Sequence, residues 1–515
     1  MKKIFNSTCS YCGVGCGIKI TREQHARLTL EGDENAPANK GMLCSKGLNL
    51  HHVVSDQSDR ILKPQMRYAR HLARQDVSWD DAMKRSAAVF KTLIDKYGPD
   101  SVGLYVSGQM LTEEYYLANK LCKGFLGTNN IDTNSRLCMS TAVMGYKQTL
   151  GEDAPPISYD DIEACSLFFI AGANPAWCHP IIFRRIEAHK AENPDVKIIC
   201  VDPRRTQTPE MSDLHLQIKP GTDIYLYNAI AALIFSKGYA DENFIAQHVD
   251  GIEALKKHLQ TIDSQKAADQ CAVNYSQIIQ AADMIGRSKT LLTMWAMGLN
   301  QSSIGVNKNL ALINLNLITG RIGKPGCGPF SLTGQGNAMG GREVGGMATM
   351  LAAHRNLDNP EHIREVAEFW GVKTLSDQPG YSATEMVEAL DDGRLKAVWI
   401  VCTNPAVSLP NSERVDAAFK KAKFVMVSEI SNRSDTLAYA DVIFPAAGWL
   451  EKEGTMTNSD RHISYLPKVV DAPGMALPDS EIFMRFATAM GFAKDFAYDC
   501  AEDIFNEHRA LTKGT

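Results

Sequence analysis

Four cysteines near the N-terminus have the spacing of a metal-cluster ligand set. Cys9, Cys12 and Cys16 form a Cys-x2-Cys-x3-Cys motif, and Cys44 follows after a long gap. Four thiolates in this pattern can surround one iron-sulfur cluster, which accepts and passes single electrons. Zinc also binds four thiolates but usually takes two Cys-x2-Cys pairs, whereas here glycines lie among the first three cysteines and let the backbone approach a cluster closely. The spacing therefore favours a 4Fe-4S cluster and a redox function.

Two basic residues are further candidates. Lys46 follows the last of these cysteines by two residues and would sit beside the cluster. Arg342 lies in a stretch, residues 320–346, that has too many glycines for a helix or strand and too varied a sequence for a flexible linker. An ordered loop of this kind usually lines a site. The guanidinium of Arg342 offers a fixed fork of donors to an oxyanion, although an isolated arginine is more often a surface charge.

The elements that must position these side chains follow one another as alternating strands and helices. Short apolar runs, each followed by a turn and then a helical pattern, occur at residues 101–106, 167–172, 197–202, 397–402 and 424–428. After the first of them a helix is predicted from Thr112 to Phe125. Such runs are typical of buried parallel strands with crossover helices, so the predicted fold class is α/β with Rossmann-like parallel sheets.

The ends of the predicted strands carry short polar turns, at residues 172–174, 202–205, 403–405 and 428–429. Ligands of open parallel sheets bind at the carboxyl ends of strands, where small residues and helix N-termini can hold a nucleotide. The chain contains neither a Gly-x-Gly-x-x-Gly fingerprint nor a Walker lysine loop, which disfavours a simple dinucleotide or ATP site. Each turn alone would be an ordinary strand-to-helix turn, but the four together favour a nucleotide-containing ligand.

Composition limits the class of protein. The 515 residues are 44% hydrophobic and 22% charged, with a formal net charge of -5, which is typical of a soluble multidomain protein and predicts neither nucleic-acid nor membrane binding. The first predicted cluster ligand is the ninth residue, which leaves no room for a signal peptide, so a cytoplasmic protein is expected. The 13 cysteines fit a reducing compartment. Those in apolar runs are expected in the core: Cys122, Cys165, Cys200 and Cys402.

Several motifs together resemble those of a known family. They are the cysteine motif, Asn134-Ser-Arg-Leu-Cys138-Met139, Met297-Gly-Leu-Asn-Gln301, Thr333-Gly-Gln-Gly-Asn337, Arg342-Glu-Val-Gly345 and Glu451-Lys-Glu-Gly-Thr-Met-Thr-Asn458. In this order they resemble the molybdopterin oxidoreductases of the dimethyl-sulfoxide-reductase superfamily, and within it the catalytic subunits of the cytoplasmic assimilatory nitrate reductases of bacteria. The resemblance covers nearly the whole chain.

The resemblance implies a molybdenum ion held by two molybdopterin guanine dinucleotides and supplied with electrons by one 4Fe-4S cluster. The four cysteines of the N-terminal motif would bind the cluster, Cys138 would give its thiolate to molybdenum, and Lys46 would lie between cluster and pterin. The contacts to the dinucleotides would come from Gln109, Asn134, Gly172, Asn174, Cys178, Asp202, Arg204, Gly221, Thr222, Asp223, Met297, Gln301, Asn404, Ser428, Glu429, Lys452 and Asp479.

Nitrate is the substrate that the resemblance implies, with Met139 and Arg342 lining the funnel to the metal. A formate dehydrogenase is the nearest alternative, because that branch shares the fold, the cofactor and the cluster. Its pattern has a histidine after the metal-binding cysteine or selenocysteine and an arginine before the Gly-Gln-Asn loop, whereas this chain has Met139 and Thr333 at those places. A non-catalytic iron-sulfur electron-transfer subunit is a further alternative, and Cys138 and Arg342 argue against it.

Relatives of this kind interleave their domains. The implied division is a cluster domain at residues 1–58, a discontinuous α/β domain formed by 59–135 and 335–515, and an inserted Rossmann-like domain at 136–334. Relatives usually continue with a C-terminal domain that covers the cofactor, and that domain is expected to be missing here. No nicotinamide or flavin motif is evident, so electrons are expected from a partner, which would be an NAD(P)H-dependent reductase subunit, ferredoxin or flavodoxin.

Overall fold

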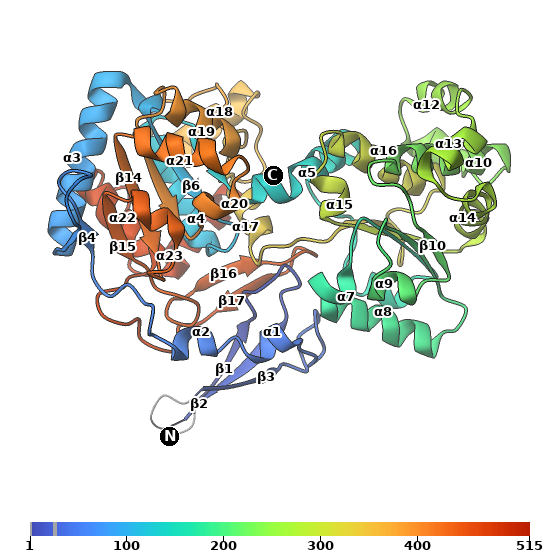
Figure 1. Cartoon of the computed structure of the whole chain (residues 1–515), viewed down its shortest axis with the longest axis horizontal. Helices are drawn as coiled ribbons and strands as arrows, with labels where there is room; N and C mark the ends of the chain where they lie inside the picture. The colour runs from blue at the N-terminus through green and yellow to red at the C-terminus, as the bar shows by residue number, and fades with distance from the viewer. Residues whose placement is uncertain (1–2, 24–27) are drawn as a thin grey trace.

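The computed structural model describes residues 3–23 and 28–515. Figure 1 shows two α/β lobes side by side, with a small sheet below them that carries the N-terminus. This sheet has the order β1-β2-β3 and is antiparallel throughout. The N-terminal elements are β1 (Lys3–Thr8), β2 (Gly17–Arg22), β3 (Leu28–Gly32), α1 (Ser45–Leu48) and α2 (His52–Ser55).

The lobe at the left of Figure 1 is built on a seven-stranded sheet with the order β5-β4-β15-β14-β13-β6-β7. Its strands come from two distant parts of the chain: β4 (Gln65–Met66), β5 (Gln75–Asp76), β6 (Val102–Val106) and β7 (Ile131–Thr133), then β13 (Ala397–Val401), β14 (Phe424–Glu429) and β15 (Val442–Pro445). The helices and short turns of this lobe are α3 (Trp79–Tyr97), η2 (Pro99–Ser101), α4 (Thr112–Asn119), η3 (Lys120–Leu126), α17 (Ala338–Glu343), α18 (Pro360–Trp370), α19 (Ala383–Asp391), α20 (Pro405–Ser408), α21 (Ser412–Lys421), η4 (Asp435–Tyr439), α22 (Asp479–Met490) and α23 (Ala501–Leu511).

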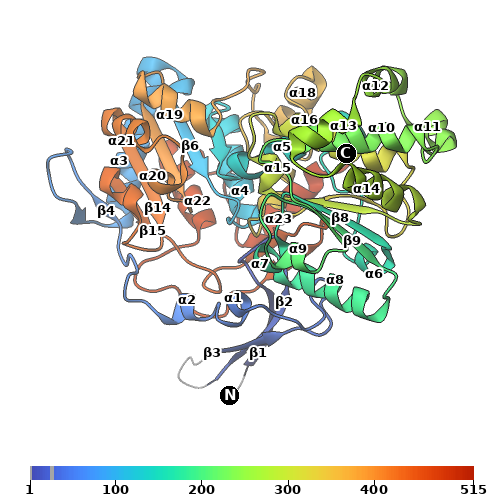
Figure 2. The same cartoon turned by 45° about the vertical axis from the view of Figure 1, so that its right-hand side comes forward.

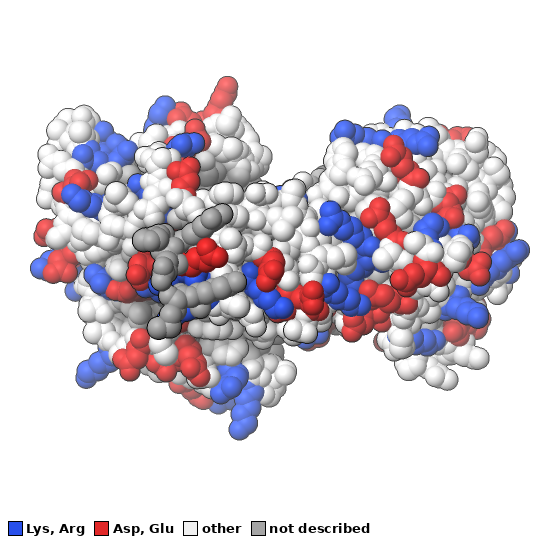
Figure 3. Space-filling model, turned by 90° about the horizontal axis from the view of Figure 1, so that it is seen from below, with Lys and Arg blue, Asp and Glu red and all other residues white. Residues whose placement is uncertain are grey.

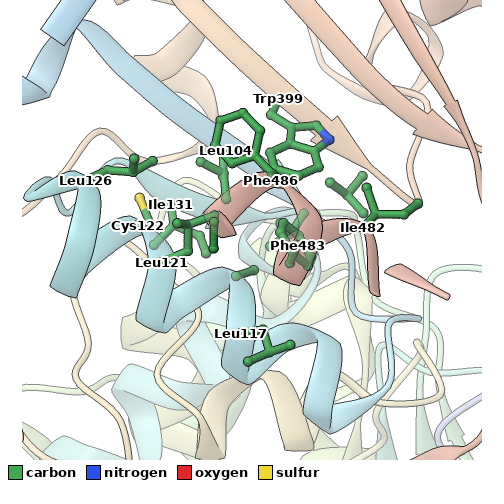
Figure 4. Close-up of a cluster of buried hydrophobic side chains, with 14 of the residues drawn as sticks. Leu104, Leu117, Leu121, Cys122, Leu126, Ile131, Trp399, Ile482, Phe483 and Phe486 are labelled. Carbon is green, nitrogen blue, oxygen red and sulfur yellow. The ribbon is translucent and has the colours of Figure 1, made fainter. Parts of the chain in front are cut away.

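Both faces of this sheet are covered, which explains why its central strands are apolar at every position. Trp399 of β13 enters the core that α3, α4 and α22 share, whereas the next residue, Ile400, enters the core beneath α19 and α21. Figure 4 shows the first of these cores, where Phe483 and Phe486 of α22 pack against Trp399. Their ring centroids lie 4.7 and 5.0 Å from that of the tryptophan. This packing fixes α4 and α22 against the sheet, close to its carboxyl edge.

The second lobe contains a five-stranded, all-parallel sheet with the order β10-β9-β8-β11-β12. Figures 1 and 2 show α7, α8 and α9 on one face and α10, α14 and α16 on the other. The strands are β8 (Leu167–Ala171), β9 (Lys197–Val201), β10 (Leu214–Leu216), β11 (Leu292–Trp295) and β12 (Gly328–Ser331). The helices are α5 (Ser135–Leu150), α6 (Asp161–Ala164), α7 (Pro175–Cys178), α8 (Pro180–Glu192), α9 (Gln207–Glu210), α10 (Asp223–Ser236), α11 (Glu242–His248), α12 (Ile252–Leu259), α13 (Ser264–Cys271), α14 (Tyr275–Arg287), α15 (Met297–Asn300) and α16 (Gly305–Ile318).

A hairpin of β16 (Gly454–Thr457) and β17 (Ile463–Leu466) lies between the N-terminal sheet and the first lobe. Its Thr455 donates hydrogen bonds from backbone and hydroxyl to the buried carboxylate of Glu113 in α4, each at 2.8 Å. Asn458, which follows β16, donates to the carbonyl of Val14 at 3.2 Å. Val14 lies in the loop that carries Cys9, Cys12 and Cys16, the cysteine loop. The hairpin therefore ties the cysteine loop to α4.

The five predicted strands are present as β6, β8, β9, β13 and β14, so the α/β class is confirmed. One predicted helix differs in its second half. The α-helix that was predicted to run to Phe125 ends at Asn119, and residues Lys120–Leu126 form a π-helix. Every side chain of α4 is buried, so the sequence offers no amphipathic period from which a change of helix type could be recognised. The segment ends at Gly127, whose φ of +79° suits glycine.

Three of the four cysteines expected in the core, Cys122, Cys165 and Cys200, are buried. Cys402 is half-buried, because it follows β13 and lines a cavity at the end of the sheet. Figure 3 shows acidic and basic side chains interspersed over the face seen from below, as the mixed charge of the sequence suggested. In the part of the chain that the structure describes, no helix has the length and apolar character needed to cross a membrane.

Candidate active site

The four predicted cluster ligands line one cavity. Cys9 follows β1 and Cys16 precedes β2, and the amide of Cys9 donates to the carbonyl of Cys16 at 2.8 Å, which closes the loop. Cys12 lies within that loop, and Cys44 is the residue before α1. Pro180, the first residue of α8, forms another wall of the cavity. The cysteines are therefore held between the N-terminal sheet and the second lobe.

The chemistry of this donor set fits an iron-sulfur cluster. Burial, together with the neighbouring Cys12 and Cys44, raises the pKa of Cys9 to about 12, so thiolates can form together here only around positive charge. Among residues 3–23 and 28–515, no three His, Cys, Asp or Glu side chains converge as the ligands of a single metal ion would. Four cysteines around one cavity suit a polynuclear iron-sulfur cluster.

Lys46 lines the same cavity. Its Nζ lies 5.5 Å from the ring centroid of Tyr11. Its charge also reaches the buried His179, because burial first and then Lys46 lower the pKa of that imidazole. Nε2 of His179 lies 2.7 Å from the carbonyl oxygen of Thr333, and its Nδ1 has no hydrogen-bond partner among the described residues. Sequence reasoning did not identify His179, which stands 133 residues from Lys46 in the chain.

The cysteine loop and the glycine-rich segment touch through glycines. The amide of Gly13 donates to the carbonyl of Gly334 at 3.0 Å. A Cβ atom at Gly13 would lie 2.4 Å from the carbonyl oxygen of Thr333, and one at Gly336 would lie 2.7 Å from that of Ser10. Any side chain at either position would separate the two loops. The backbone of the segment is thus in direct contact with the predicted cluster site.

Cys138 lies in the first turn of α5 and faces the glycine-rich segment, residues 320–346, from the side opposite the cysteine loop. Its Sγ lies 3.6 Å from Sδ of Met297, and a Cβ at Gly334 would be 3.5 Å from that sulfur. Burial raises the pKa of Cys138 to about 11, whereas the guanidinium of Arg342 lowers it. Met139 is buried beside Cys138 in the core of the second lobe. The structure therefore brings together Cys138, Met139, Met297 and Arg342, as the resemblance implied.

Arg342 is not the surface charge that an isolated arginine suggests. It lies in α17, is 6% exposed, and pairs through Nη1 with Oδ1 of Asp153 at 3.1 Å. Its Nη2 contacts Sδ of Met339. Nε of Arg342 and Oδ2 of Asp153 have no hydrogen-bond partner among the described residues, although both atoms are buried. Sequence reasoning missed Asp153, because an acid in the loop after α5 gives no signal of a partner 189 residues away.

A cavity of about 380 Å³ opens at the carboxyl edge of the seven-stranded sheet. Six of the predicted dinucleotide contacts line it: Gln109, Asn404, Ser428, Glu429, Lys452 and Asp479. Nζ of Lys452 lies 2.7 Å from Oε1 of Glu114 and 3.1 Å from Oδ2 of Asp479. Burial raises the pKa of Asp479, although Lys452 opposes the shift, and Oδ1 of Asp479 lacks a partner among the described residues. This buried oxygen is available to a ligand donor, which fits the nitrogen-rich pterin and guanine rings. Glu114 was not predicted.

The remaining predicted contacts lie mostly at the carboxyl edge of the five-stranded sheet. Gly172 follows β8, Asn174 precedes α7 and Cys178 ends it, Asp202 and Arg204 follow β9, and Gly221 and Thr222 precede α10, which Asp223 begins. This group lies on the other lobe from the 380 Å³ cavity. Asp223 is 6% exposed and pairs with Lys308 of α16 at 2.7 Å, a partner that sequence reasoning also missed.

Two structural details suit this edge to a nucleotide. The guanidinium of Arg204 lies 5.3 Å from the ring centroid of Trp177, which is 51% exposed and could stack on a base. Gly298 donates from its amide to the carbonyl of Gly172 at 2.9 Å, and a Cβ at Gly172 would lie 2.9 Å from the carbonyl carbon of Gly298. Because the backbone at Gly298 is held against Gly172, the neighbouring Met297 lies between the sheet edge and Cys138.

Asn134 and Gln301 hold loops together at the junction of the two lobes. The Asn134 side chain accepts from the amide of Gly108 at 3.0 Å and lies 3.4 Å from the hydroxyl of Thr403, so it joins the ends of β6 and β13. Gln301 donates through Nε2 to the carbonyl of Leu137 at 2.9 Å, one residue before Cys138. Both side chains therefore support the loops around Cys138.

Comparison with known proteins agrees with this geometry. The model of the family "Molybdopterin oxidoreductase" matches residues 60–489, and that of the "Molybdopterin oxidoreductase Fe4S4 domain" matches residues 2–56. A nitrate reductase of Klebsiella oxytoca is 44% identical over 98% of this chain and 57% of its own length. The assimilatory nitrate reductase catalytic subunit of Bacillus subtilis is 35% identical over 100% of this chain and 72% of its own length. The chain thus spans little more than half of the Klebsiella relative.

A solved structure shares the fold. Acetylene hydratase from Pelobacter acetylenicus matches with a TM-score of 0.80 at 20% identity, over 98% of this chain and 72% of that one. The cysteine loop, the motif around Cys138 and the sheets of both lobes lie within the ranges that the two family models match. Because one of these models matches far more than half of the chain, the protein belongs to the molybdopterin oxidoreductase family.

Proposed function

We propose that this chain forms the catalytic part of an assimilatory nitrate reductase. In that reaction nitrate takes up two electrons and two protons and gives nitrite and water. The observation that carries the proposal is the buried guanidinium of Arg342 next to Cys138, in a chain whose relatives include nitrate reductases. When bound, molybdenum held by molybdopterin guanine dinucleotide supplies the site that accepts the oxygen atom.

The protein's own residues bind and orient the anion. Arg342 offers Nε, which is without a protein partner among the described residues, to a nitrate oxygen, and Asp153 holds the guanidinium in place. Met139 and Met297 line the site with apolar side chains and so exclude water. Cys138 would give its thiolate to the metal and tune it, and Gln335, whose side chain lowers the pKa of Cys138, would orient the sulfur.

The two sheet edges suggest where the guanine dinucleotides bind. We assign one to the cavity that contains Lys452 and Asp479, and the other to the edge with Asp202, Arg204 and Trp177. Residues 59–135 with 335–515 would form the first binding domain, residues 136–334 the second, and residues 1–58 the cluster domain. The composition of the two sheets supports this division, because one takes its strands from residues 65–133 and 397–445 and the other from residues 167–331.

Electrons would enter through the cluster and pass Lys46. The Lys46→Met variant is expected to slow reduction of the molybdenum centre roughly 10-fold while the KM for nitrate stays unchanged, because the lysine lies beside the cluster cavity and not beside Arg342. Rapid-mixing spectroscopy of cluster reoxidation by nitrate, together with steady-state kinetics, measures both effects. The exposed Lys63 provides a matched control, Lys63→Met. Equal losses in rate and in nitrate binding would contradict the role of Lys46.

The donor and the compartment belong to the same proposal. A cytoplasmic enzyme of this kind would take electrons from an NAD(P)H-dependent reductase subunit, ferredoxin or flavodoxin. The Bacillus relative is named as a catalytic subunit, which supports an electron donor on a separate polypeptide.

Metal analysis with a paired activity assay tests the proposed function. We expect about one molybdenum and about four iron atoms per chain in protein purified without oxygen, and oxidation of reduced viologen that depends on nitrate. Formate oxidation without nitrate reduction would assign the protein to the formate dehydrogenases instead, although Met139 and Thr333 disfavour that reaction. Iron without molybdenum and without turnover would favour an electron-transfer subunit.

A further inference from the structure

A lysine in the interior of the first lobe pairs with no carboxylate among the described residues. Lys123 lies in the π-helical segment η3 and is 1% exposed. Its Nζ donates to the carbonyl oxygens of Gly345 at 2.8 Å, Met347 at 2.9 Å and Met350. The three hydrogens of one ammonium group thus meet three main-chain carbonyls of a single segment, residues 344–350.

Burying an ammonium group costs free energy, which indicates a specific role for Lys123. Burial lowers the pKa of Lys123 to about 7, so the charged form is disfavoured in the folded chain. An apolar side chain in place of Lys123 would avoid that cost but would leave the three buried carbonyls of segment 344–350 without donors. Asn119, one turn earlier, acts in the same way, since its Nδ2 donates to the carbonyl of Val344 at 2.7 Å. Asn119 ends α4 and Lys123 follows it by four residues in η3, a spacing that puts both donors on the side of the same segment.

Segment 344–350 begins directly after α17, the helix that carries Arg342. The segment turns back sharply at Gly345, whose φ is +69° and whose Cβ would lie 2.2 Å from the carbonyl carbon of Leu351. The amide of Ala353 then donates to the carbonyl of Glu343 at 2.8 Å. A displacement of this segment would therefore move the end of α17.

We propose that Lys123 is a positioning residue for Arg342: by holding the carbonyls of segment 344–350, it fixes α17 so that the guanidinium stays beside Cys138 and Asp153. The effect on nitrate rests on the proposed function, whereas the effect on the segment does not. Lys123 touches neither Arg342 nor the predicted substrate path, so it acts only through the backbone that follows α17.

The Lys123→Met variant tests the proposal, because methionine fills a similar volume without donating hydrogen bonds. We expect the KM for nitrate to rise about 10-fold or more while kcat changes less than about threefold, because a small displacement of Arg342 weakens anion binding most. We also expect faster amide hydrogen exchange across residues 344–351. Exchange is measured by mass spectrometry on the same holoenzyme preparations that are used for kinetics.

Lys120→Met is the matched control. Lys120 lies in the same π-helical segment, is 4% exposed, and donates to Glu507, the hydroxyl of Tyr498 and the carbonyl of Asp495 at 2.7, 2.7 and 2.9 Å. It therefore faces α23 and the loop before it instead of segment 344–350. Its removal is expected to lower the melting temperature without changing the KM for nitrate or the exchange of residues 344–351.

The outcomes separate this inference from the proposed function. An unchanged KM in Lys123→Met, or an equal rise in Lys120→Met, would overturn the positioning role. If Lys123→Met does not fold, Asn119→Ala removes a single donor to the same segment, and a smaller rise in KM supports the role while no change rejects it.

Wild-type protein that binds its cofactors yet never reduces nitrate would reject the proposed function. In that case faster exchange of residues 344–351 in Lys123→Met than in Lys120→Met still supports the positioning role, and equal exchange rejects it.

Discussion

The Cys138→Ser variant is expected to lose nitrate turnover by at least about 100-fold while keeping its iron, because a serine hydroxyl stays protonated where a thiolate would bind the metal. Serine differs from cysteine by one atom, so the substitution changes the chemistry beside Arg342 and Met297 more than the packing. Nitrite production with reduced viologen gives the turnover, and mass spectrometry of the purified protein gives molybdenum and iron.

A second buried thiol provides the control for this substitution. Cys165 is 2% exposed and donates to the carbonyl of Leu167 at 3.1 Å, a hydrogen bond that serine can keep. Cys165→Ser is therefore expected to turn over nitrate like the wild type. Full activity in Cys138→Ser would reject the assignment of this sulfur to the metal, and an equal loss in both variants would attribute the effect to general damage of the core.

Removing the guanidinium of Arg342 is expected to affect both binding and stability. In Arg342→Gln the KM for nitrate should rise about 10- to 100-fold, the equivalent of losing charge-assisted hydrogen bonds worth about 1.5–3 kcal/mol. The same change leaves Asp153 as a buried carboxylate without its partner, which should lower the free energy of unfolding by about 3–5 kcal/mol. Steady-state kinetics and denaturant unfolding measure the two effects independently.

The double variant Arg342→Gln, Asp153→Asn separates these effects. Neutralising Asp153 removes the unpaired charge, so much of the stability should return while the high KM for nitrate remains. If the KM recovered together with stability, Arg342 would act only as the counter-charge of Asp153 and not as an anion contact.

The strands could be predicted because the pattern that marks each of them lies within a few consecutive residues. In β8 and β13 all five side chains are buried, and a continuous apolar run ending in a polar turn identifies such a strand from the sequence. The cysteine loop was recognisable for the same reason, since three of its ligands lie within eight residues. The positions around Cys138 came from resemblance to a family and not from spacing.

The missed residues share a different property. Asp153, Glu114, Lys308 and His179 gain their significance from partners that are distant in the chain, such as Lys452, which pairs with Glu114 across 338 residues. No sequence period or local motif specifies such a pair, because it depends on how two lobes and a hairpin meet. The π-helical turn at Lys120–Leu126 escaped prediction because the whole of α4 before it and most of the turn itself are buried, which removes the pattern that distinguishes helix types.

The split origin of the seven-stranded sheet has a consequence for how the chain folds during synthesis. β6 and β7 leave the ribosome early, but β13, which pairs with β6 at the centre of the sheet, follows roughly 260 residues later, a delay of about 10–50 s at ordinary translation rates. Meanwhile the core beneath α10 and α16 can close, because its members all come from residues 138–318. The apolar strand Val102–Val106 therefore lacks its partner β13 while the core of the second lobe has already formed. Chaperone protection of this strand matters most during this interval.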